Sequence, residues 1–110
     1  MSLKQSNKPD YLLQQGLTYH QKGQLSLALK IYKQILKYDP KNFEALQLNA
    51  TLYLQQKKYK KALKFLRLAL IINPSVPYVN YNYGNVLHNL QHFDEALKSY
   101  DRAIQLKPDY

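Results

Sequence analysis

The chain repeats its own residue pattern every 34 positions along its 110 residues. Three columns show this spacing most clearly, one of alanine, one of proline and one of small residues. They are Ala28, Ala62 and Ala96; Pro40, Pro74 and Pro108; and Gly16, Ala50 and Gly84. A fixed period with matched columns is the signature of a repeat array, in which each unit buries its apolar face against the next. The period therefore decides the fold class before composition does.

Three units, 9–42, 43–76 and 77–110, follow a polar leader of residues 1–8 that we expect to lack structure. The leader has no apolar core of the kind that a signal peptide needs. Its start, Met1-Ser2-Leu3, resembles an expression leader rather than native sequence. We expect a single repeat domain over 9–110.

Composition narrows the function classes. The chain has no cysteine, which excludes disulfides, thiolate metal sites and cysteine nucleophiles. No apolar run approaches the roughly 20 residues of a membrane span. We expect a cytoplasmic protein that needs no metal ion or cofactor.

Each unit is predicted to form two helices separated by a short break. In the second unit, Leu46, Ala50 and Tyr53 recur at the spacing of one helical face. Proline near the end of each unit stops the second helix, because proline disfavours helical geometry in the residue before it. The spacing predicts helices over 10–22, 24–38, 44–56, 58–72, 77–90 and 92–107.

Small residues halfway along the first helices suggest close helix packing. Glycine inside a helix costs roughly 0.5–1 kcal/mol relative to alanine, so Gly16 and Gly84 need a packing reason. Because Ala50 stands in the same column, the sequence predicts that Gly84→Ala is tolerated and that Gly84→Leu is not. A column of larger residues is expected to fill space between units: Tyr32, Leu66 and Tyr100.

The columns resemble those of the tetratricopeptide repeat family across 9–110. The third unit matches that family's pattern best, through Tyr83, Gly84, Leu87, Ala96, Tyr100, Ala103 and Pro108. The first unit departs from it at Ile35, where the family has alanine. The early tryptophan of the family is replaced in all three units, by Leu12, Leu46 and Asn80. The resemblance implies an all-α fold of antiparallel helix pairs, stacked as a right-handed superhelix whose first helices line a concave groove.

By that resemblance, the groove holds amide, aromatic and apolar side chains and no lysine or arginine. The candidate peptide-binding residues are Gln14, Leu17, Gln47, Leu48, Thr51, Leu54, Tyr78, Tyr81, Asn82, Asn85, His88 and Asn89. Amides both donate and accept hydrogen bonds, so they suit the backbone of an extended peptide. Exposed leucines on the same face, Leu13, Leu17, Leu48 and Leu54, favour a binding groove over a merely solvated surface.

Two subclasses of the family make different predictions for this groove. Some members clamp the C-terminal carboxylate of heat-shock chaperones with lysine and arginine. The matching positions here carry no cation, which argues against that ligand: Leu13, Leu17, Leu48, Tyr78 and Asn82. The third unit is also similar to repeats of bacterial O-linked N-acetylglucosamine transferases, which grip peptides with an asparagine ladder. The ladder column here reads Gln14, Leu48 and Asn82, so one of its three positions is asparagine.

Catalytic and metal-binding patterns are weak in this chain. No serine lies in a nucleophile motif, and no glycine-rich phosphate loop is present. Asp94 and Glu95 are adjacent, and neighbouring residues on a helix do not face each other. His88 and His92 have the spacing of two zinc ligands, but His92 falls at the break between helices and no third ligand is near. We expect no enzymatic activity.

Positive charge is concentrated in the middle unit, which has six basic residues and one acidic residue. The basic patch is Lys57, Lys58, Lys60, Lys61, Lys64 and Arg67. Such a patch gives salt-dependent affinity for phosphates. However, Tyr59 belongs to the packing column Leu25, Tyr59 and Phe93, so we expect it to be buried rather than free to stack on a base. A solvated outer face is the simpler explanation of the patch.

The last predicted helix carries apolar residues with no further helix after it in the sequence. They are Leu97, Tyr100, Ala103, Ile104 and Leu106. Because repeat arrays need polar terminal caps, this pattern suggests a fragment of a longer array or a face that pairs with a partner, including a second copy.

Three hypotheses for function remain. The first is a non-catalytic module that binds an extended peptide or partner segment in the groove. The second is the targeting or substrate-recognition segment of a larger bacterial enzyme, such as a glycosyltransferase. The third and weakest is a nucleic-acid or anionic-surface binder acting through the basic patch.

Overall fold

The computed structural model describes residues 8–109, and every regular element in that range is a helix. The helices are α2 (Lys8–Gln21), α3 (Leu25–Tyr38), α4 (Phe43–Gln55), α5 (Tyr59–Ile72), α6 (Pro77–Asn89) and α7 (Phe93–Leu106). Each predicted helix is present, with ends within two residues of the expected ones. Lys8 begins α2, and the rest of the expected leader, 1–7, lies outside the described residues.

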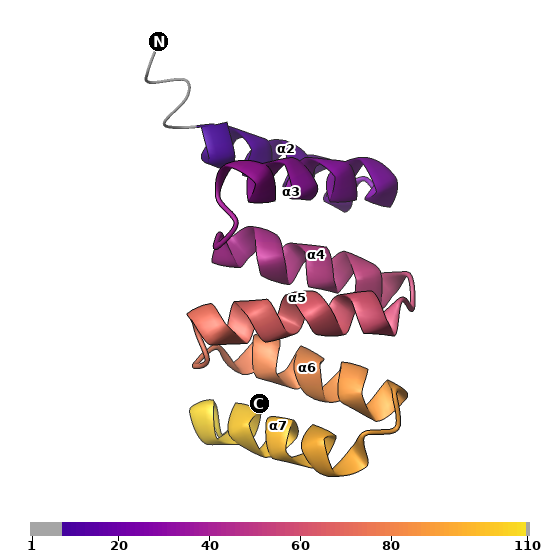
Figure 1. Cartoon of the computed structure of the whole chain (residues 1–110), viewed down its shortest axis with the longest axis vertical. Helices are drawn as coiled ribbons and strands as arrows, with labels where there is room; N and C mark the ends of the chain where they lie inside the picture. Colours follow the sequence, from indigo (N-terminus) through magenta and orange to yellow (C-terminus); the bar gives the residue numbers. More distant parts are fainter. Residues whose placement is uncertain (1–7, 110) are drawn as a thin grey trace.

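The helices cross the long axis of the molecule one after another, as the rungs of a ladder do (Figure 1). The structure measures 49 × 25 × 23 Å. Each helix packs mainly against its neighbours in chain order, which gives the pairs α2/α3, α4/α5 and α6/α7 and the junctions α3/α4 and α5/α6. The all-α solenoid of helix pairs that the 34-residue period predicts is confirmed.

The turn inside each pair has the same backbone geometry in all three repeats. One residue adopts the left-handed conformation there, namely Gly23 (φ 75°), Lys57 (φ 59°) and Gln91 (φ 66°). In the middle repeat, the amide of Lys57 donates to the carbonyl of Leu54 and the next amide, of Lys58, donates to Tyr53. These bonds satisfy carbonyls that the end of a helix leaves open. The turn therefore keeps its shape although only the first repeat has glycine there.

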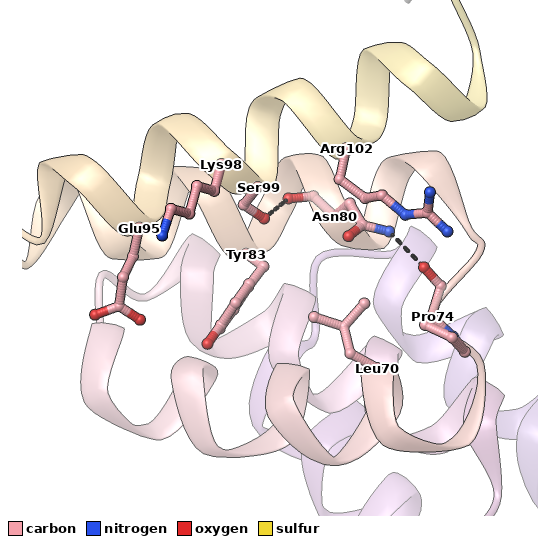
Figure 2. A pocket seen from close by; sticks show the side chains of 8 residues that line it. All are labelled: Leu70, Pro74, Asn80, Tyr83, Glu95, Lys98, Ser99 and Arg102. Atoms are coloured by element: carbon pink, nitrogen blue, oxygen red, sulfur yellow. Dashed lines mark hydrogen bonds between the residues drawn. The ribbon is translucent and has the colours of Figure 1, made fainter.

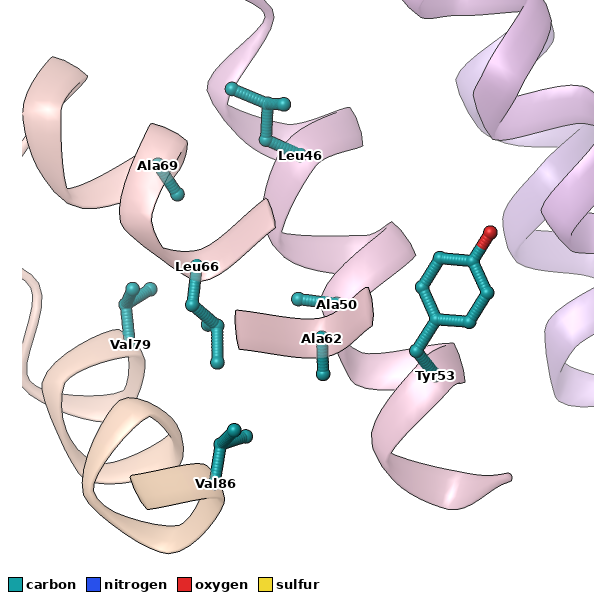
Figure 3. Packing of buried hydrophobic residues seen from close by; sticks show 8 residues of the cluster. All are labelled: Leu46, Ala50, Tyr53, Ala62, Leu66, Ala69, Val79 and Val86. Atoms are coloured by element: carbon teal, nitrogen blue, oxygen red, sulfur yellow. The ribbon is translucent and has the colours of Figure 1, made fainter. Parts of the chain in front are cut away.

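The core lies between repeats as much as within them. Leu66 and Ala69 of α5 are fully buried and pack against Val79 and Val86 of α6 (Figure 3). The equivalent cluster at the previous junction contains Tyr32, Ile35, Ala45 and Leu52. Burial of apolar surface at these junctions supplies the stability that separate helix pairs would lack.

The small column faces the large column within each repeat, at a separation of sixteen residues. The pairs are Gly16 with Tyr32, Ala50 with Leu66, and Gly84 with Tyr100. A Cβ atom built on Gly84 would lie 2.7 Å from Cδ1 of Tyr100, and one on Gly16 would collide with the Tyr32 ring. The tyrosines therefore cover glycine in their own repeat, which the sequence did not predict. The expected tolerance of Gly84→Ala is contradicted by this close approach. Ala50 is no guide to position 84, because the counterpart of Tyr100 in the middle repeat is the smaller Leu66.

The outer side of α7 exposes apolar side chains whose counterparts on α5 are partly buried. Phe93, Leu97 and Ile104 are 56%, 61% and 51% exposed. Their counterparts one repeat earlier, including Leu63 and Leu70, are partly buried against the central cluster. Phe93 was expected to be a packing residue like Tyr59, and that expectation is wrong because α7 packs on one side only.

Candidate peptide-binding groove

The first helices of successive repeats lie beside one another. Nε2 of His20 in α2 is 3.2 Å from Oε1 of Gln55 in α4. Helices α4 and α6 also contact each other directly. The face shared by α2, α4 and α6 is the candidate groove, and the twelve predicted residues all belong to these three helices. Tyr81 lies toward α7, where it borders a recess with Tyr100 and Ile104.

The third repeat presents the most polar part of this face. Helical periodicity places Tyr78, Asn82, Asn85 and Asn89 on one side of α6. Tyr78 is 40% exposed as a residue, and Tyr81, on the neighbouring side, is 43% exposed. His88 and Asn89 are exposed, and Asn82 and Asn85 are half-buried. Amides and phenols that are partly exposed offer both hydrogen bonds and contact area to a ligand.

Asn85 is held in place by a residue of the second helix. The hydroxyl of Tyr100 donates a hydrogen bond of 2.6 Å to Oδ1 of Asn85. Burial, with a smaller contribution from the charge of Tyr81, raises the pKa of Tyr100, so the hydroxyl keeps its proton. The bond occupies Oδ1 and leaves Nδ2 of Asn85 to donate to another group. Nδ2 of Asn89 instead donates to the backbone carbonyl of Asn85 at 2.8 Å.

The first repeat has a comparable arrangement. The hydroxyl of Tyr32 is 3.4 Å from Nδ1 of His20, whose Nε2 faces Gln55. One neutral tautomer satisfies both contacts: Nδ1 accepts from Tyr32, and Nε2–H donates to Oε1 of Gln55. Burial raises the pKa of Tyr32 to about 12. The sequence predicts only a packing role for both tyrosines. The available signal was the glycine sixteen residues before each of them, which leaves room for the ring against the first helix.

The middle of the groove is less polar and less open than predicted. Gln47 is only 8% exposed. The hydroxyl of Thr51 donates to the carbonyl of Gln47 at 2.9 Å. Leu48 and Leu54 are not free surface leucines, because each packs against one of the two core clusters. Of the two predicted residues on α2, Gln14 is exposed and Leu17 is half-buried, as is Leu13.

The basic patch lies on α5 and the turn before it, and all six of its side chains are exposed. Tyr59 is half-buried and packs against the core, as expected, so it is not available to stack on a base. Several cations of the patch contact aromatic rings of the protein itself. Nζ of Lys61 lies 5.6 Å from the centre of the Tyr53 ring, and Nε of Arg67 donates to the hydroxyl of Tyr83 at 3.2 Å.

The two histidines near the α6–α7 turn have local partners. The rings of His88 and Phe93 meet edge to face with centres 5.3 Å apart, and Nδ1 of His92 is 3.5 Å from Oε1 of Glu95. Within residues 8–109, no three acidic or histidine side chains gather where they could hold a metal ion. Over the same range, no helix combines the length and apolarity needed to span a membrane.

Comparison with protein families matches the tetratricopeptide repeat over residues 19–80 and again over 77–110. Among curated proteins, the chain is 32% identical over 98 residues to human Superkiller complex protein 3. That alignment covers 89% of this chain and 6% of the relative. It is also 32% identical over 91 residues to the mouse protein O-mannosyl-transferase TMTC1, covering 79% of this chain and 10% of that protein. The chain spans less than a quarter of the length of the curated relatives it matches.

Solved structures share the fold closely. The first TPR of Spaghetti (RPAP3), bound to the HSP90 peptide SRMEEVD, superposes with a TM-score of 0.90 at 28% identity. The match covers 96% of this chain and 83% of that one. An O-GlcNAc transferase from Thermobaculum terrenum gives a TM-score of 0.88 at 28% identity, over 96% of this chain and 20% of the enzyme.

These matches agree with the 34-residue period, the repeated left-handed turns and the solenoid of helix pairs. One family match alone spans more than half of the chain. The chain belongs to the tetratricopeptide repeat family.

Proposed function

We propose that this domain is a non-catalytic interaction module that binds an extended peptide, or an extended segment of a partner protein, along the first helices. The observation that carries the proposal is the hydrogen bond between Tyr100 and Oδ1 of Asn85. It fixes the amide so that Nδ2 of Asn85 can donate to a peptide carbonyl. Asn82 lies about one turn away on the same helix face and extends the polar contact.

Exposed tyrosines beside these amides complete the proposed site. Tyr78 and Tyr81 are 40% and 43% exposed and flank the asparagines. Rigid phenols give contact area with little loss of side-chain entropy on binding. The RPAP3 structure carries a bound peptide on the same fold, which supports a peptide as the ligand class. That peptide is acidic, and the clamp positions of this chain, such as Leu13 and Leu48, carry no cation for a C-terminal carboxylate.

The test begins with a pull-down from source-cell lysate and identification of the bound proteins by mass spectrometry. Labelled peptides from the captured partner are then titrated against the domain. We expect Asn82→Ala with Asn85→Ala to weaken binding by about 10–100-fold, since each lost hydrogen bond costs about 0.5–1.5 kcal/mol. Tyr100→Phe is expected to weaken binding by a smaller factor, because it removes only the hydroxyl that orients Asn85.

The control variant neutralises Lys57, Lys58, Lys60 and Lys61 on the turn and α5, away from the proposed site. It is expected to bind the same peptide normally. Equal affinity of the asparagine variant and the wild type for a validated peptide would rule out the groove as the site.

A second proposal is that the domain recognises substrates for a larger enzyme. The likeness to the repeats of an O-GlcNAc transferase and the identity to a short stretch of an O-mannosyl-transferase support it. Examination of the complete gene tests this proposal directly. A catalytic domain in the same protein, with activity on peptides that the groove binds, would support it, and a protein made of repeats alone would refute it.

A further inference from the structure

A separate pocket lies on the side of α6 that faces away from Asn82 and Asn85. Its volume is about 330 Å³, and it is bounded by the end of α5, one side of α6 and the length of α7 (Figure 2). The α6 residues that line it are Asn80 and Tyr83. Helical periodicity puts these two residues on the opposite side of α6 from the proposed groove. A ligand here would therefore not compete with a ligand in the groove.

The base of the pocket is apolar and held in a fixed shape. Leu70 and Pro74 form its apolar part, below the side chains that project from α7 (Figure 2). Nδ2 of Asn80 donates to the carbonyl of Pro74 at 3.0 Å, and the hydroxyl of Ser99 donates to the carbonyl of Asn80 at 2.6 Å. These polar groups satisfy one another, so they tie the turn between α5 and α6 to α6 and α7 without needing a ligand.

The rim of the pocket is mainly cationic. Lys98 and Arg102 extend along it from α7, and within residues 8–109 the side chain of neither one forms a hydrogen bond or an ion pair. Arg67 of α5 does not line the pocket, but its Nε donates to the hydroxyl of Tyr83, which does, so a third cation lies beside the pocket wall. Glu95 is the one carboxylate among the residues that line the pocket. The apolar surface continues outward at Ile71, which is 78% exposed and adjoins Arg67 on α5.

We propose that this pocket is a second binding site, for an acidic peptide segment of a partner protein that carries an apolar side chain. The apolar side chain would lie against Leu70 and Pro74, and flanking carboxylates would pair with Lys98, Arg102 and Arg67. A cationic rim around an apolar base selects for such a segment by charge and by shape.

Glu95 favours a peptide over other anionic partners. A peptide backbone supplies N–H groups along its length that can donate to the Glu95 carboxylate, whereas the phosphate groups that would pair with Lys98 and Arg102 carry no donor at physiological pH. The pocket lining also lacks an exposed aromatic ring on which a base could stack, since Tyr83 is half-buried and bonded to Arg67. The recess between helices suits a single side chain better than a flat membrane surface.

The probe is a fluorescein-labelled peptide of ten residues with one central leucine flanked by glutamates, measured by fluorescence anisotropy. Two control peptides carry glutamine in place of glutamate or serine in place of leucine. We expect both controls to bind at least about tenfold more weakly than the probe. We expect Lys98→Gln with Arg102→Gln to weaken binding of the probe about tenfold or more.

A matched variant, Lys22→Gln with Lys41→Gln, makes the same change in net charge at exposed positions of the first repeat. It is expected to bind the probe within about twofold of the wild type, as is Asn82→Ala with Asn85→Ala. Retention in the asparagine variant separates this proposal from the proposed groove function, so either one can fail without the other.

Four results would overturn the proposal. They are no binding of the probe at millimolar protein, equal losses in both charge variants, equal binding of the serine peptide, and displacement of the probe by a single-stranded oligonucleotide or phosphatidylserine vesicles that bind more tightly through Lys98 and Arg102. The last result would assign the pocket to nucleic acid or lipid instead.

Discussion

The ring of Tyr100 occupies the space that a side chain at position 84 would need, with Cδ1 and Cε1 each 2.7 Å from a Cβ built on Gly84. The middle repeat solves the same packing problem with Ala50 and Leu66, and the outer repeats solve it with glycine and tyrosine. Where the first helix of a repeat has glycine instead of alanine, its second helix therefore has tyrosine instead of leucine.

Gly84→Ala is therefore expected to destabilise the domain. Overpacking costs about 1–3 kcal/mol, and the better helix propensity of alanine offsets about 0.5–1 kcal/mol of it, so we expect a net loss of up to about 2.5 kcal/mol. Combining it with Tyr100→Leu recreates the Ala50–Leu66 pairing and should recover stability beyond the sum of the single changes. Urea denaturation of all four proteins measures this coupling. Additive effects would mean that the ring moves aside freely.

In the left-handed turns, glycine is expected to stabilise the domain for a different reason, which is the backbone conformation. Lys57→Gly or Gln91→Gly should raise the free energy of unfolding by up to about 1 kcal/mol, because a left-handed backbone is strained for a residue with a Cβ. Gly23→Ala should lower it by about 1 kcal/mol. No atom lies within 4 Å of a Cβ at Gly23, so any loss there comes from the backbone alone. Thermal and urea unfolding monitored by circular dichroism compare the three variants, and a loss of stability in Lys57→Gly would contradict the prediction.

Asn49 is fully buried in α4, and neither Oδ1 nor Nδ2 finds a hydrogen-bond partner in the described part of the chain. A buried amide without a partner costs about 1–3 kcal/mol. Asn49→Leu, which is close in size, is therefore expected to stabilise the domain by about 1–3 kcal/mol in urea denaturation. Asn49→Asp is expected to destabilise it, because it would bury a charge. A loss of stability in the leucine variant would show that the amide has a partner in solution.

The buried hydroxyl of Tyr32 is expected to make the free energy of unfolding fall at alkaline pH. Its pKa is raised to about 12 in the folded state, from about 10 in an unfolded chain. Between these values the unfolded state has lost the proton and the folded state keeps it, so stability falls as pH rises from about 10 to about 12. Two pKa units correspond to about 2–3 kcal/mol. Tyr32→Phe should reduce this slope when unfolding free energies are measured across that range, and an unchanged slope would contradict the prediction.

The exposed apolar face of α7 predicts self-association. Leu97→Glu with Ile104→Glu should lower the tendency of the chain to form dimers or larger species, measured by light scattering across a range of concentrations. Both side chains are more than half exposed, so the unfolding free energy should change by no more than about 0.5 kcal/mol. Identical molar masses for the variant and the wild type at all concentrations would show that this face does not pair with a second copy.

The helix boundaries could be predicted well from the sequence because the repeat pattern shows each boundary three times. Both ends of α4 and the start of α5 differ from their expected positions by one residue, and α5 ends where expected. Periodicity says which face of a helix is buried, but it does not say which partner covers that face. Tyr32 and Leu66 do pack at the junctions between repeats, as expected. Periodicity did not reveal that the rings of Tyr32 and Tyr100 also cover glycine and that their hydroxyls reach His20 and Asn85.

The groove was harder to predict than the fold. Exposure depends on how closely neighbouring helices approach, which a single sequence does not give, so Gln47 and Leu48 were expected to be more open than they are. The left-handed turns could not be predicted in the second and third repeats, because Lys57 and Gln91 stand where the first repeat has glycine. Family resemblance could place the groove residues on the first helices, but it could not reveal that a residue of α7 orients Asn85.

Since each helix packs chiefly on its neighbours in chain order, the two ends of the array have no core in common. An opening of α6 and α7 away from α5 would break the contacts of one junction and leave the pair α2/α3 as it was. The domain therefore has no single shared core, and its stability is expected to be a sum of contributions from successive helix pairs and junctions.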